Sequence, residues 1–522
     1  MGGTLSQVTM KGIVKTFPGV KACNQIDFDV KGGEVHALLG ENGAGKSTLM
    51  KILYGMLRPE SGEIAIDGTQ VEFRSPADAL KAGIGMIHQH FMLVPTMTVA
   101  QNVALGQKSS RGFLLDLDVV SQKVRELSAA YGLKVNPDDL VAHLSVGEQQ
   151  RVEIIKALYL GAQIIILDEP TAVLTPQEVD DLFVVLKKMV AEGHGLVFIS
   201  HKLHEVTALS DRITVLRDGH CMGTCLSGGM SRDSLVKLMV GRELKALTSR
   251  ESHAGPVRLQ IVNLCVAGDR GNQTVSGVSL AVHSGEILGI AGVAGNGQRE
   301  LAEALIGVRP VTSGEILLDG QDLSGWKLNR RIDSGMAIIP EERMLDGAIR
   351  DFSVQENVFL HDHAEKAFRT GIFLRFKKMA EHARNLVSDF KVKTPNLDVP
   401  IRNLSGGNIQ KLIMARELSR RPNALIASQP TRGVDIGASE YIRQQLLNQR
   451  DDGTAVLLIS EDLDELFDLS DRIAVMYEGH IMGIFGRHEA DVRTIGFLMA
   501  GMKPEDIPEP DESRPGCLDA VV

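Results

Sequence analysis

Nine residues near the start of the chain have the types and spacing of a phosphate-binding loop. In order they are Gly40, Glu41, Asn42, Gly43, Ala44, Gly45, Lys46, Ser47 and Thr48. They match the pattern G-x-x-x-x-G-K-[ST], in which glycines let backbone N–H groups approach phosphate oxygens without a side-chain clash. The lysine supplies a fixed positive charge, and the hydroxyl after it can bind Mg²⁺. The sequence therefore predicts a nucleotide site with Lys46 on the phosphates and Ser47 on the metal.

A pair of carboxylates further along the chain supplies the rest of a hydrolytic site. Asp168 and Glu169 follow the apolar run Ile164-Ile165-Ile166-Leu167. After a phosphate loop, the first carboxylate of such a pair suits Mg²⁺, and the second can polarise an attacking water. The simpler interpretation is an acidic turn after a buried strand. The phosphate loop upstream favours the catalytic one.

These residues can act together only if regular elements bring them to one edge of a sheet. Residues 34–39 form an apolar run of strand length, and residues 47–56 read as a helix whose N-terminus points at the phosphates. Further buried strands are expected at 164–168 and 196–200, after a helical stretch at about 100–160. This alternation predicts an α/β fold with parallel strands.

Composition and charge limit the classes of partner. The chain has 522 residues, a formal net charge of −10 and 4% aromatic residues. The acidic balance argues against a polyanion partner, and the few aromatics argue against a stacking surface for single-stranded nucleic acid. Apolar runs have strand length and stay short of the roughly 18 residues that a membrane-spanning helix needs. We therefore expect any link to a membrane to run through a partner.

The sequence repeats itself. The segment Ser61-Gly62-Glu63-Ile64 recurs as Ser313-Gly314-Glu315-Ile316, and Asp211-Arg212-Ile213 recurs as Asp471-Arg472-Ile473. This repetition predicts two copies of one domain, at 6–243 and 257–502, with a short insertion and a helical stretch at about 355–422 in the second. Residues 503–522, rich in proline and acidic residues, are expected to be a disordered tail.

A third motif links both copies to a known family. Leu144-Ser145-Val146-Gly147-Glu148 resembles the signature motif of ABC-type ATPases, and Leu404-Ser405 with Gly407 repeats it. In this resemblance Gln89 takes the Q-loop position, His201 the switch-histidine position and Phe17 the place of an aromatic that stacks on adenine. For Phe17 a position in the core stays an alternative, and for His201 a structural role does.

The resemblance covers both repeats and implies a fold, cofactors and residue roles. It implies two tandem P-loop ABC ATPase domains, each with a mixed sheet core, a β-rich start and an inserted helical subdomain. The cofactors would be ATP and Mg²⁺. The catalytic residues would be Glu169, His201, Gln89 and Lys46, and the metal would be held by Ser47, Gln89 and Asp168.

The second copy departs from this pattern at the positions that handle phosphate. Its loop runs from Gly292 to Glu300, with Gln298 in place of the lysine and Arg299 and Glu300 in place of the hydroxyls. Ser428-Gln429 stands where the carboxylates should be. Glu341 takes the Q-loop place, Glu461 takes the histidine place, and 261–284 holds no phenylalanine, tyrosine or tryptophan.

Two motifs of the second copy are nevertheless intact. One is the signature Ser405, Gly406, Gly407 and Asn408, and the other is the acidic D-loop residue Asp435. ABC ATPase domains pack head to tail, and each ATP is held by one domain's phosphate loop and the other's signature. With this arrangement the intact parts meet at one composite site and the altered parts meet at the other. The resemblance thus implies one catalytic site and one degenerate site.

Two fused ATPase domains with a short linker resemble the ATP-binding subunit of simple-sugar importers. The run from His88 to Val99 resembles the branch linked to nucleoside uptake. The resemblance implies a peripheral protein on the cytoplasmic face of the inner membrane that drives solute import. Its partners would be transmembrane permease subunits and, through them, a solute-binding protein, without nucleic acid. The solute stays open among nucleosides, ribose-like and galactose-like sugars.

Two other classes are weighed against the importer. One is a soluble tandem ABC ATPase that acts on ribosomes or nucleic acid. Such proteins usually keep two competent sites and a long basic linker, whereas this chain is acidic and one of its sites is altered. The other is a regulatory ABC protein without a permease, which stays open.

Overall fold

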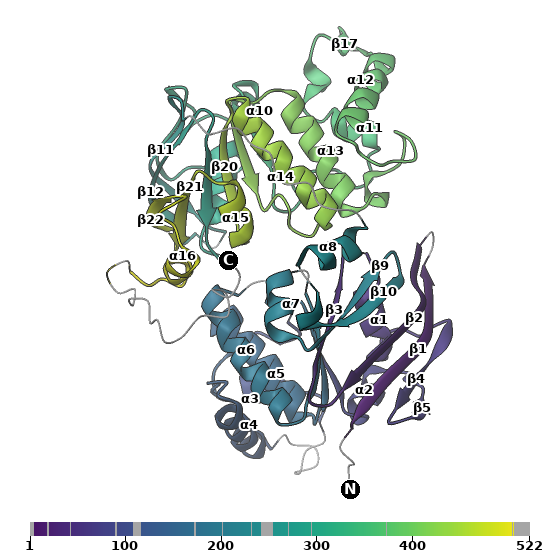
Figure 1. Ribbon diagram of the computed structural model, residues 1–522. Coiled ribbons are helices and arrows are strands. Elements are labelled where there is room, and N and C mark those ends of the chain that lie inside the picture. Colours follow the sequence, from purple (N-terminus) through teal and green to yellow (C-terminus); the bar gives the residue numbers. More distant parts are fainter. Residues whose placement is uncertain are drawn as a thin grey trace. The chain divides into compact units, whose positions relative to one another are not determined.

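The computed structural model describes residues 5–17, 20–41, 43–88, 91–107, 116–171, 174–200, 202–230, 232–241, 254–269, 271–293, 295–371, 373–503 and 505. These residues form two compact units, one made by the described residues up to 241 and the other by those from 254 onward (Figure 1). The predicted site residues Asn42, Gln89 and His201 lie outside the described residues, and so does nearly all of the predicted tail.

A six-stranded sheet forms the centre of the first unit, in the order β10-β9-β3-β8-β7-β6. Its strands are β3 (Val35–Gly40), β6 (Ile84–Ile87), β7 (Ile164–Asp168), β8 (Gly195–Ile199), β9 (Arg212–Arg217) and β10 (His220–Leu226). All neighbours are parallel except β9 and β10. The carboxyl ends of the parallel strands therefore meet at one edge, where ligands bind in sheets of this kind.

The β-rich start is a second, antiparallel sheet of four strands in the order β2-β1-β4-β5. These are β1 (Gln7–Phe17), β2 (Val20–Lys31), β4 (Ser61–Ile66) and β5 (Thr69–Val71). Helix α1 (Lys46–Leu53) packs between the two sheets, because Leu49 and Leu53 share one buried cluster with Ile13 of β1 and Ile166 of β7. The sheet thus braces the helix that begins at the phosphate loop.

Helix α1 ends earlier than the predicted range of 47–56. Tyr54 is the C-cap, and Gly55 follows with φ of 76°. A left-handed glycine just after a helix lets its last carbonyls find partners and stops the helix. The predicted strands, by contrast, begin and end within one residue of those observed.

Helices cover the rest of the first unit. Helices α3 (Val99–Ala104), α4 (Leu117–Tyr131) and α5 (Val146–Tyr159) pack on one another and form the inserted helical part. The others are α2 (Pro76–Lys81), α6 (Pro176–Ala191), α7 (Leu203–Leu209) and α8 (Arg232–Val240). Helix α5 carries the first signature motif at its N-terminus.

The second unit repeats this plan and confirms the α/β class. Its six-stranded sheet has the order β16-β19-β20-β13-β21-β22, and its four-stranded sheet the order β12-β11-β14-β15. The strands are β11 (Val257–Ala267), β12 (Gln273–His283), β13 (Ile287–Ala291), β14 (Ser313–Leu318), β15 (Gln321–Asp322), β16 (Met336–Ile339), β19 (Ala424–Ser428), β20 (Ala455–Ser460), β21 (Arg472–Tyr477) and β22 (His480–Gly486).

Helices of the second unit follow the same order as those of the first. They are α9 (Gln298–Ile306), α10 (Leu328–Asp333), α11 (Val354–Val358), α12 (Phe376–Asp389), α13 (Gly406–Ser419), α14 (Ile436–Asp451), α15 (Leu463–Leu469) and α16 (Val492–Met499). Two short strands, β17 (Arg369–Thr370) and β18 (Phe373–Leu374), form a small ladder beside α11 and α12 (Figure 1).

His36 joins the two sheets of the first unit beneath the phosphate loop. Its Nδ1 donates to the carbonyl of Asp29 on β2 at 2.6 Å, so its Nε2 accepts from the hydroxyl of Thr214 on β9 at 2.8 Å. The ring is fully buried and stacks on Phe28. Burial, aided by the nearby Arg212 guanidinium, lowers the pKa of His36 to about 4. At neutral pH the uncharged His36 ring therefore packs in the core of the first unit like an apolar side chain.

We predict that acid weakens the first unit through this histidine. The folded-state pKa of about 4 lies below the ordinary 6.5, so the unfolded chain takes up the proton first. The stabilisation is complete above pH 6.5 and is lost as the pH falls toward 4, which corresponds to about 2 kcal/mol between pH 7 and pH 5. Hydrogen exchange of the β3 amides at pH 7 and at pH 5 measures this loss of stability. The variant His36→Leu should not show this pH dependence. Strand β13 of the second unit, where Leu288 occupies the position of His36, should not show it either. An unchanged pH dependence in the variant would contradict the prediction.

Candidate functional site

The loop between β3 and α1 is shaped to bring backbone close to a ligand. Gly43 and Gly45 have φ of 87° and 104°, which side-chain-bearing residues rarely adopt. A Cβ on Gly45 would also lie 2.2 Å from the carbonyl oxygen of Ala22 on β2. Gly45 therefore allows α1 to start directly against the antiparallel sheet, with its N-terminal N–H groups at the loop.

Lys46 is the first residue of α1 and is 6% exposed. Its Nζ donates to the carbonyl oxygens of Gly40 at 2.7 Å and Glu41 at 3.0 Å. Burial lowers the pKa of Lys46, while the carboxylates of Glu169, Asp168 and Glu41 raise it. The ammonium is thus held inside the loop by carbonyls and faces the carboxylates at the end of β7.

The carboxylate of Asp168 meets the hydroxyl of Ser47. Asp168 ends β7 and is buried, and its pKa is raised by burial and by the neighbouring Glu169, while Lys46 and a hydrogen bond from Ser47 lower it. A hydroxyl and a carboxylate in contact, beside an ammonium and a second carboxylate, are the donor set expected for Mg²⁺ bound with nucleotide phosphates. The residues present therefore fit a magnesium–nucleotide group.

Glu169 stands just beyond the strand in a strained conformation. Its φ is 50°, and its N–H donates to the carbonyl of Ile199 at 3.0 Å. A left-handed non-glycine residue stores roughly 1–3 kcal/mol and persists only when its surroundings hold it. Gln429, at the same place in the second unit, has φ of 47° and donates to Ile459. Both units therefore adopt this turn whichever residue is present. The side chain at this position, Glu169 or Gln429, determines whether a carboxylate is available there.

Phe17 lies at the end of β1 and is 42% exposed, with the Lys15 ammonium 5.9 Å from its ring centroid. An exposed ring at a strand end is available to stack on a flat ligand, whereas a core phenylalanine would be buried. This placement agrees with the adenine-stacking role expected from the resemblance.

The two signature motifs differ in how their serines are used. The Ser145 hydroxyl caps α5 by accepting from Glu148 N–H, and Glu148 in turn accepts from Ser145 N–H at 2.8 Å. The hydroxyl of Ser405 makes no such cap on α13 and instead accepts from Asn408 Nδ2 at 2.8 Å. The Ser145 hydroxyl therefore caps the backbone of its helix, whereas the Ser405 hydroxyl is bonded to a side chain of α13 and does not cap the backbone N–H groups.

Carboxylates also crowd the first signature more than the second. A Cβ on Gly147 would lie 2.4 Å from Glu178 Oε1, so this carboxylate sits directly against the N-terminal turn of α5. Together with Glu148 it offsets the positive end of the helix, where an anion would otherwise bind. At the second signature, a Cβ on Gly407 would lie 2.9 Å from Ala438 Cβ, where the first unit has Glu178, and 3.0 Å from Asp435 Oδ2. The Asp435 carboxylate caps α14 by accepting from Ala438 N–H at 2.7 Å.

In the second unit, substituted side chains fill the loop and its surroundings. Gln298 Nε2 donates to the carbonyl of Val293 at 3.1 Å, much as Lys46 donates to Glu41. The side chain of Glu341 forms an ion pair with Arg432. The N–H of Glu461 donates to Gln429 Oε1 at 3.4 Å. In this unit an amide occupies the position of the lysine, and a second amide occupies the position of Glu169.

One buried carboxylate near the first site escaped the sequence reasoning. Glu205 on α7 is 1% exposed and accepts hydrogen bonds from Thr171 and Ser200, which flank Glu169 and His201 in the chain. The repeat offered a signal, because Glu465 occupies the same place in the second copy.

Comparison with known proteins agrees with this arrangement. The sequence model of the family described as ABC transporter matches residues 23–172 and again 275–432. A glucose import ATP-binding protein of Haloferax volcanii is 47% identical over 94% of this chain and 95% of its own length. A nucleoside import ATP-binding protein of Lactococcus lactis is 45% identical, over 95% and 98%. A ribose import ATP-binding protein of Rubrobacter xylanophilus is 42% identical, over 94% and 98%.

Solved structures also resemble both units together. An archaeal ribosome recycling factor, crystallised with a ribosomal stalk protein, matches 95% of this chain and 94% of its own with a TM-score of 0.60. At 20% sequence identity this likeness shows a shared fold alone. Within the part of the chain that the structure describes, no helix is long and apolar enough to cross a membrane.

Proposed function

Because this chain belongs to the ABC transporter family of ATPases, we propose that it is the energy-coupling subunit of an importer for nucleosides or simple sugars. The relatives named for glucose, nucleoside and ribose import, each aligned over nearly its whole length, support this proposal. Their different solutes leave the solute of this chain open between nucleosides and sugars. The subunit would work at the cytoplasmic face of the membrane, with permease subunits and a solute-binding protein as partners.

The observation that carries the proposal is the buried Lys46 ammonium facing Asp168 and Glu169 at the end of β7. When bound, Mg²⁺-ATP supplies the phosphoanhydride bond whose hydrolysis releases free energy. Lys46 and the loop N–H groups would hold the phosphates, and Ser47 and Asp168 would hold the metal, with Gln89 as a further ligand. Glu169 would orient a water and accept its proton, and His201 would act as the switch histidine that the resemblance implies.

Only one of the two possible sites is competent in this proposal. The first phosphate loop acts with the second signature, Ser405, Gly406, Gly407 and Asn408, and with Asp435. The hydroxyl of Ser405, which does not cap its helix, supports this pairing. The complementary pairing would join Gln298 and Gln429 to a signature whose serine is committed and which two carboxylates crowd.

The catalytic assignment predicts unequal effects of two matched substitutions. Glu169→Gln removes the general base and should lower the ATPase turnover by about 10²–10⁴-fold. Gln429→Glu, at the same left-handed position of the second unit, should leave turnover within about twofold. Steady-state phosphate release from the purified protein measures both. Normal turnover in Glu169→Gln would show that the one-site assignment is wrong.

The pairing of loop and signature predicts a second asymmetry. Ser405→Ala should lower turnover by roughly tenfold or more, since a hydrogen bond to a charged group contributes about 1.5–3 kcal/mol. Ser145→Ala should instead destabilise the first unit by about 1 kcal/mol through the lost helix cap, with turnover nearly unchanged. Phosphate release and thermal unfolding are measured on both variants, and equal losses of turnover would refute the pairing.

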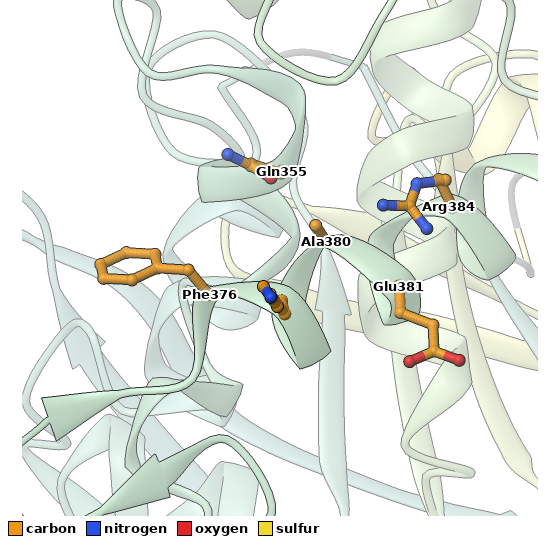
Figure 2. Close-up of a pocket in the computed structure, with 6 residues that line it drawn as sticks. Gln355, Phe376, Ala380, Glu381 and Arg384 are labelled. Atoms are coloured by element: carbon orange, nitrogen blue, oxygen red, sulfur yellow. The ribbon is translucent and has the colours of Figure 1, made fainter.

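The helical part of the second unit offers a place for the permease. A pocket of about 480 Å³ lies there, and Figure 2 shows Gln355 of α11 and Phe376, Ala380, Glu381 and Arg384 of α12 around it. Phe376 is 69% exposed, and Phe373 of β18 is 74% exposed. Exposed aromatics beside a pocket mark a surface that binds another protein. We include this surface in the proposal as a permease contact.

Replacing Phe376 should uncouple the subunit from its permease without harming ATP hydrolysis. Phe376→Glu places a charge where an apolar contact is expected, so co-purification with the permease encoded beside this chain should fall at least tenfold. The ATPase activity of the isolated subunit should stay within about twofold. Val308→Glu, an equally polar change at an exposed valine of the same unit, is the matched control. Retained co-purification of Phe376→Glu would exclude this contact surface.

A further inference from the structure

A buried carboxylate joins the turn that carries Glu169 to the end of the neighbouring strand β8. Glu205 Oε2 accepts from the hydroxyl of Thr171 at 2.6 Å and from the hydroxyl of Ser200 at 3.0 Å. Thr171 lies two residues after Glu169, and Ser200 lies directly before His201. One side chain of α7 is thus bonded to the chain on both sides of the site.

Lys202 closes this cluster. Its Nζ lies 3.3 Å from Glu205 Oε1 and donates to the carbonyl of Thr171 at 3.4 Å. Its N–H donates to the hydroxyl of Ser200 at 3.1 Å. The carboxylate therefore has both oxygens occupied, and its charge is offset by an ammonium, as a group that is 1% exposed requires.

The cluster lies where the sheet no longer holds the ends of β7 and β8 together. The β7–β8 ladder ends at the pair Asp168 and Ile199, and one further hydrogen bond joins Glu169 N–H to Ile199. Beyond it Pro170 and Thr171 form a turn, and Ser200 has left the sheet. Glu169 is also in the strained left-handed region, which neighbouring contacts must maintain. Thr171 bound to Glu205 is such a contact, two residues away.

We propose that Glu205 is a positioning residue for ATP hydrolysis, which fixes the turn of Glu169 relative to Ser200 at the end of β8. It does not touch the reacting atoms. Its effect is geometric, because a general base displaced by about 1 Å can lose around 10²-fold in rate. This inference rests on the proposed catalytic role of Glu169.

The second unit provides the same cluster without the same chemistry. Glu465 is also 1% exposed and accepts from the hydroxyl of Ser460 at 2.7 Å and from Thr431. Asp462 stands at the position of Lys202, so the cation beside Glu465 comes from a different helix. It is Arg443 of α14, whose Nε lies 3.8 Å from Glu465 Oε1. Gln429 stands here in place of the base. Replacing Glu465 therefore measures how much the cluster contributes to the stability of the fold alone. Any additional loss of kcat on replacing Glu205 measures its contribution to catalysis.

The test compares Glu205→Gln with Glu465→Gln. Glutamine keeps the size of the side chain, but its NH2 group only donates, so it cannot replace the carboxylate oxygen that accepts from Lys202 or the one that accepts from the hydroxyls of Thr171 and Ser200. We expect Glu205→Gln to lower kcat by about 10–100-fold with KM for ATP and the binding of a fluorescent ATP analogue within about twofold. Glu465→Gln should leave kcat nearly unchanged, although both variants lower the thermal midpoint.

A second pair of variants keeps the proposal testable if Glu205→Gln folds poorly. Thr171→Val removes the hydroxyl at nearly constant volume and should reproduce the loss of kcat, and Thr171→Ser should restore it. Hydrogen exchange of the peptide from 164 to 171 without nucleotide should rise in Thr171→Val and return to normal in Thr171→Ser.

The outcomes separate this inference from the proposed function. Equal kcat losses in Glu205→Gln and Glu465→Gln, or an unchanged kcat in both Glu205→Gln and Thr171→Val, would overturn the positioning role. Glu169→Gln is measured alongside. If Glu169→Gln keeps normal turnover, the site assignment itself fails. If it is inactive while both Glu205→Gln and Thr171→Val are normal, only the positioning role fails.

Discussion

The interaction on which the rest of the site depends is the burial of the Lys46 ammonium inside the loop. A buried cation needs partners, and the fold supplies two kinds, the carbonyls of Gly40 and Glu41 and the carboxylates at the end of β7. The carbonyls can face inward only because the glycines allow a tight loop against β2. The carboxylates of Asp168 and Glu169 lie near Lys46 because β7 belongs to the same sheet as β3 and runs parallel to it. The burial of Lys46 therefore depends at once on the strand order of the sheet, on the geometry of the loop and on the nearby charges.

The second unit shows how the same backbone accommodates the loss of that cation. Gln298 donates to Val293 from the position of the lysine, and neutral Gln429 keeps the strained turn. An uncharged amide needs no carboxylate opposite it, so the two changes are electrostatically consistent with one another. The backbone is preserved because the buried strands and left-handed glycines determine it, independently of the nucleotide.

Much of this could be predicted from the sequence, because the signals are local. The phosphate loop, the strand before Asp168 and both signatures depend on residues within a few positions of one another, and the repeat identified the second fold. What escaped were contacts between distant segments. Glu178 against Gly147 and Glu205 against Thr171 join residues more than 30 positions apart. The recurrence of Glu205 as Glu465 marks the residue as part of the repeat, but it does not indicate which residues the carboxylate contacts. The early end of α1 was missed because Gly55 outweighed the apolar residues after it.

The ion pair between Glu341 and Arg432 has a consequence for how the second unit tolerates substitution. Replacing Glu341 alone would leave the Arg432 guanidinium without this carboxylate, and replacing Arg432 alone would leave Glu341 without this cation. Gln429 and Glu461 are linked in a similar way, because the N–H of Glu461 donates to Gln429 Oε1. Substitutions at two linked positions are therefore not independent, and their effects on stability should not simply add.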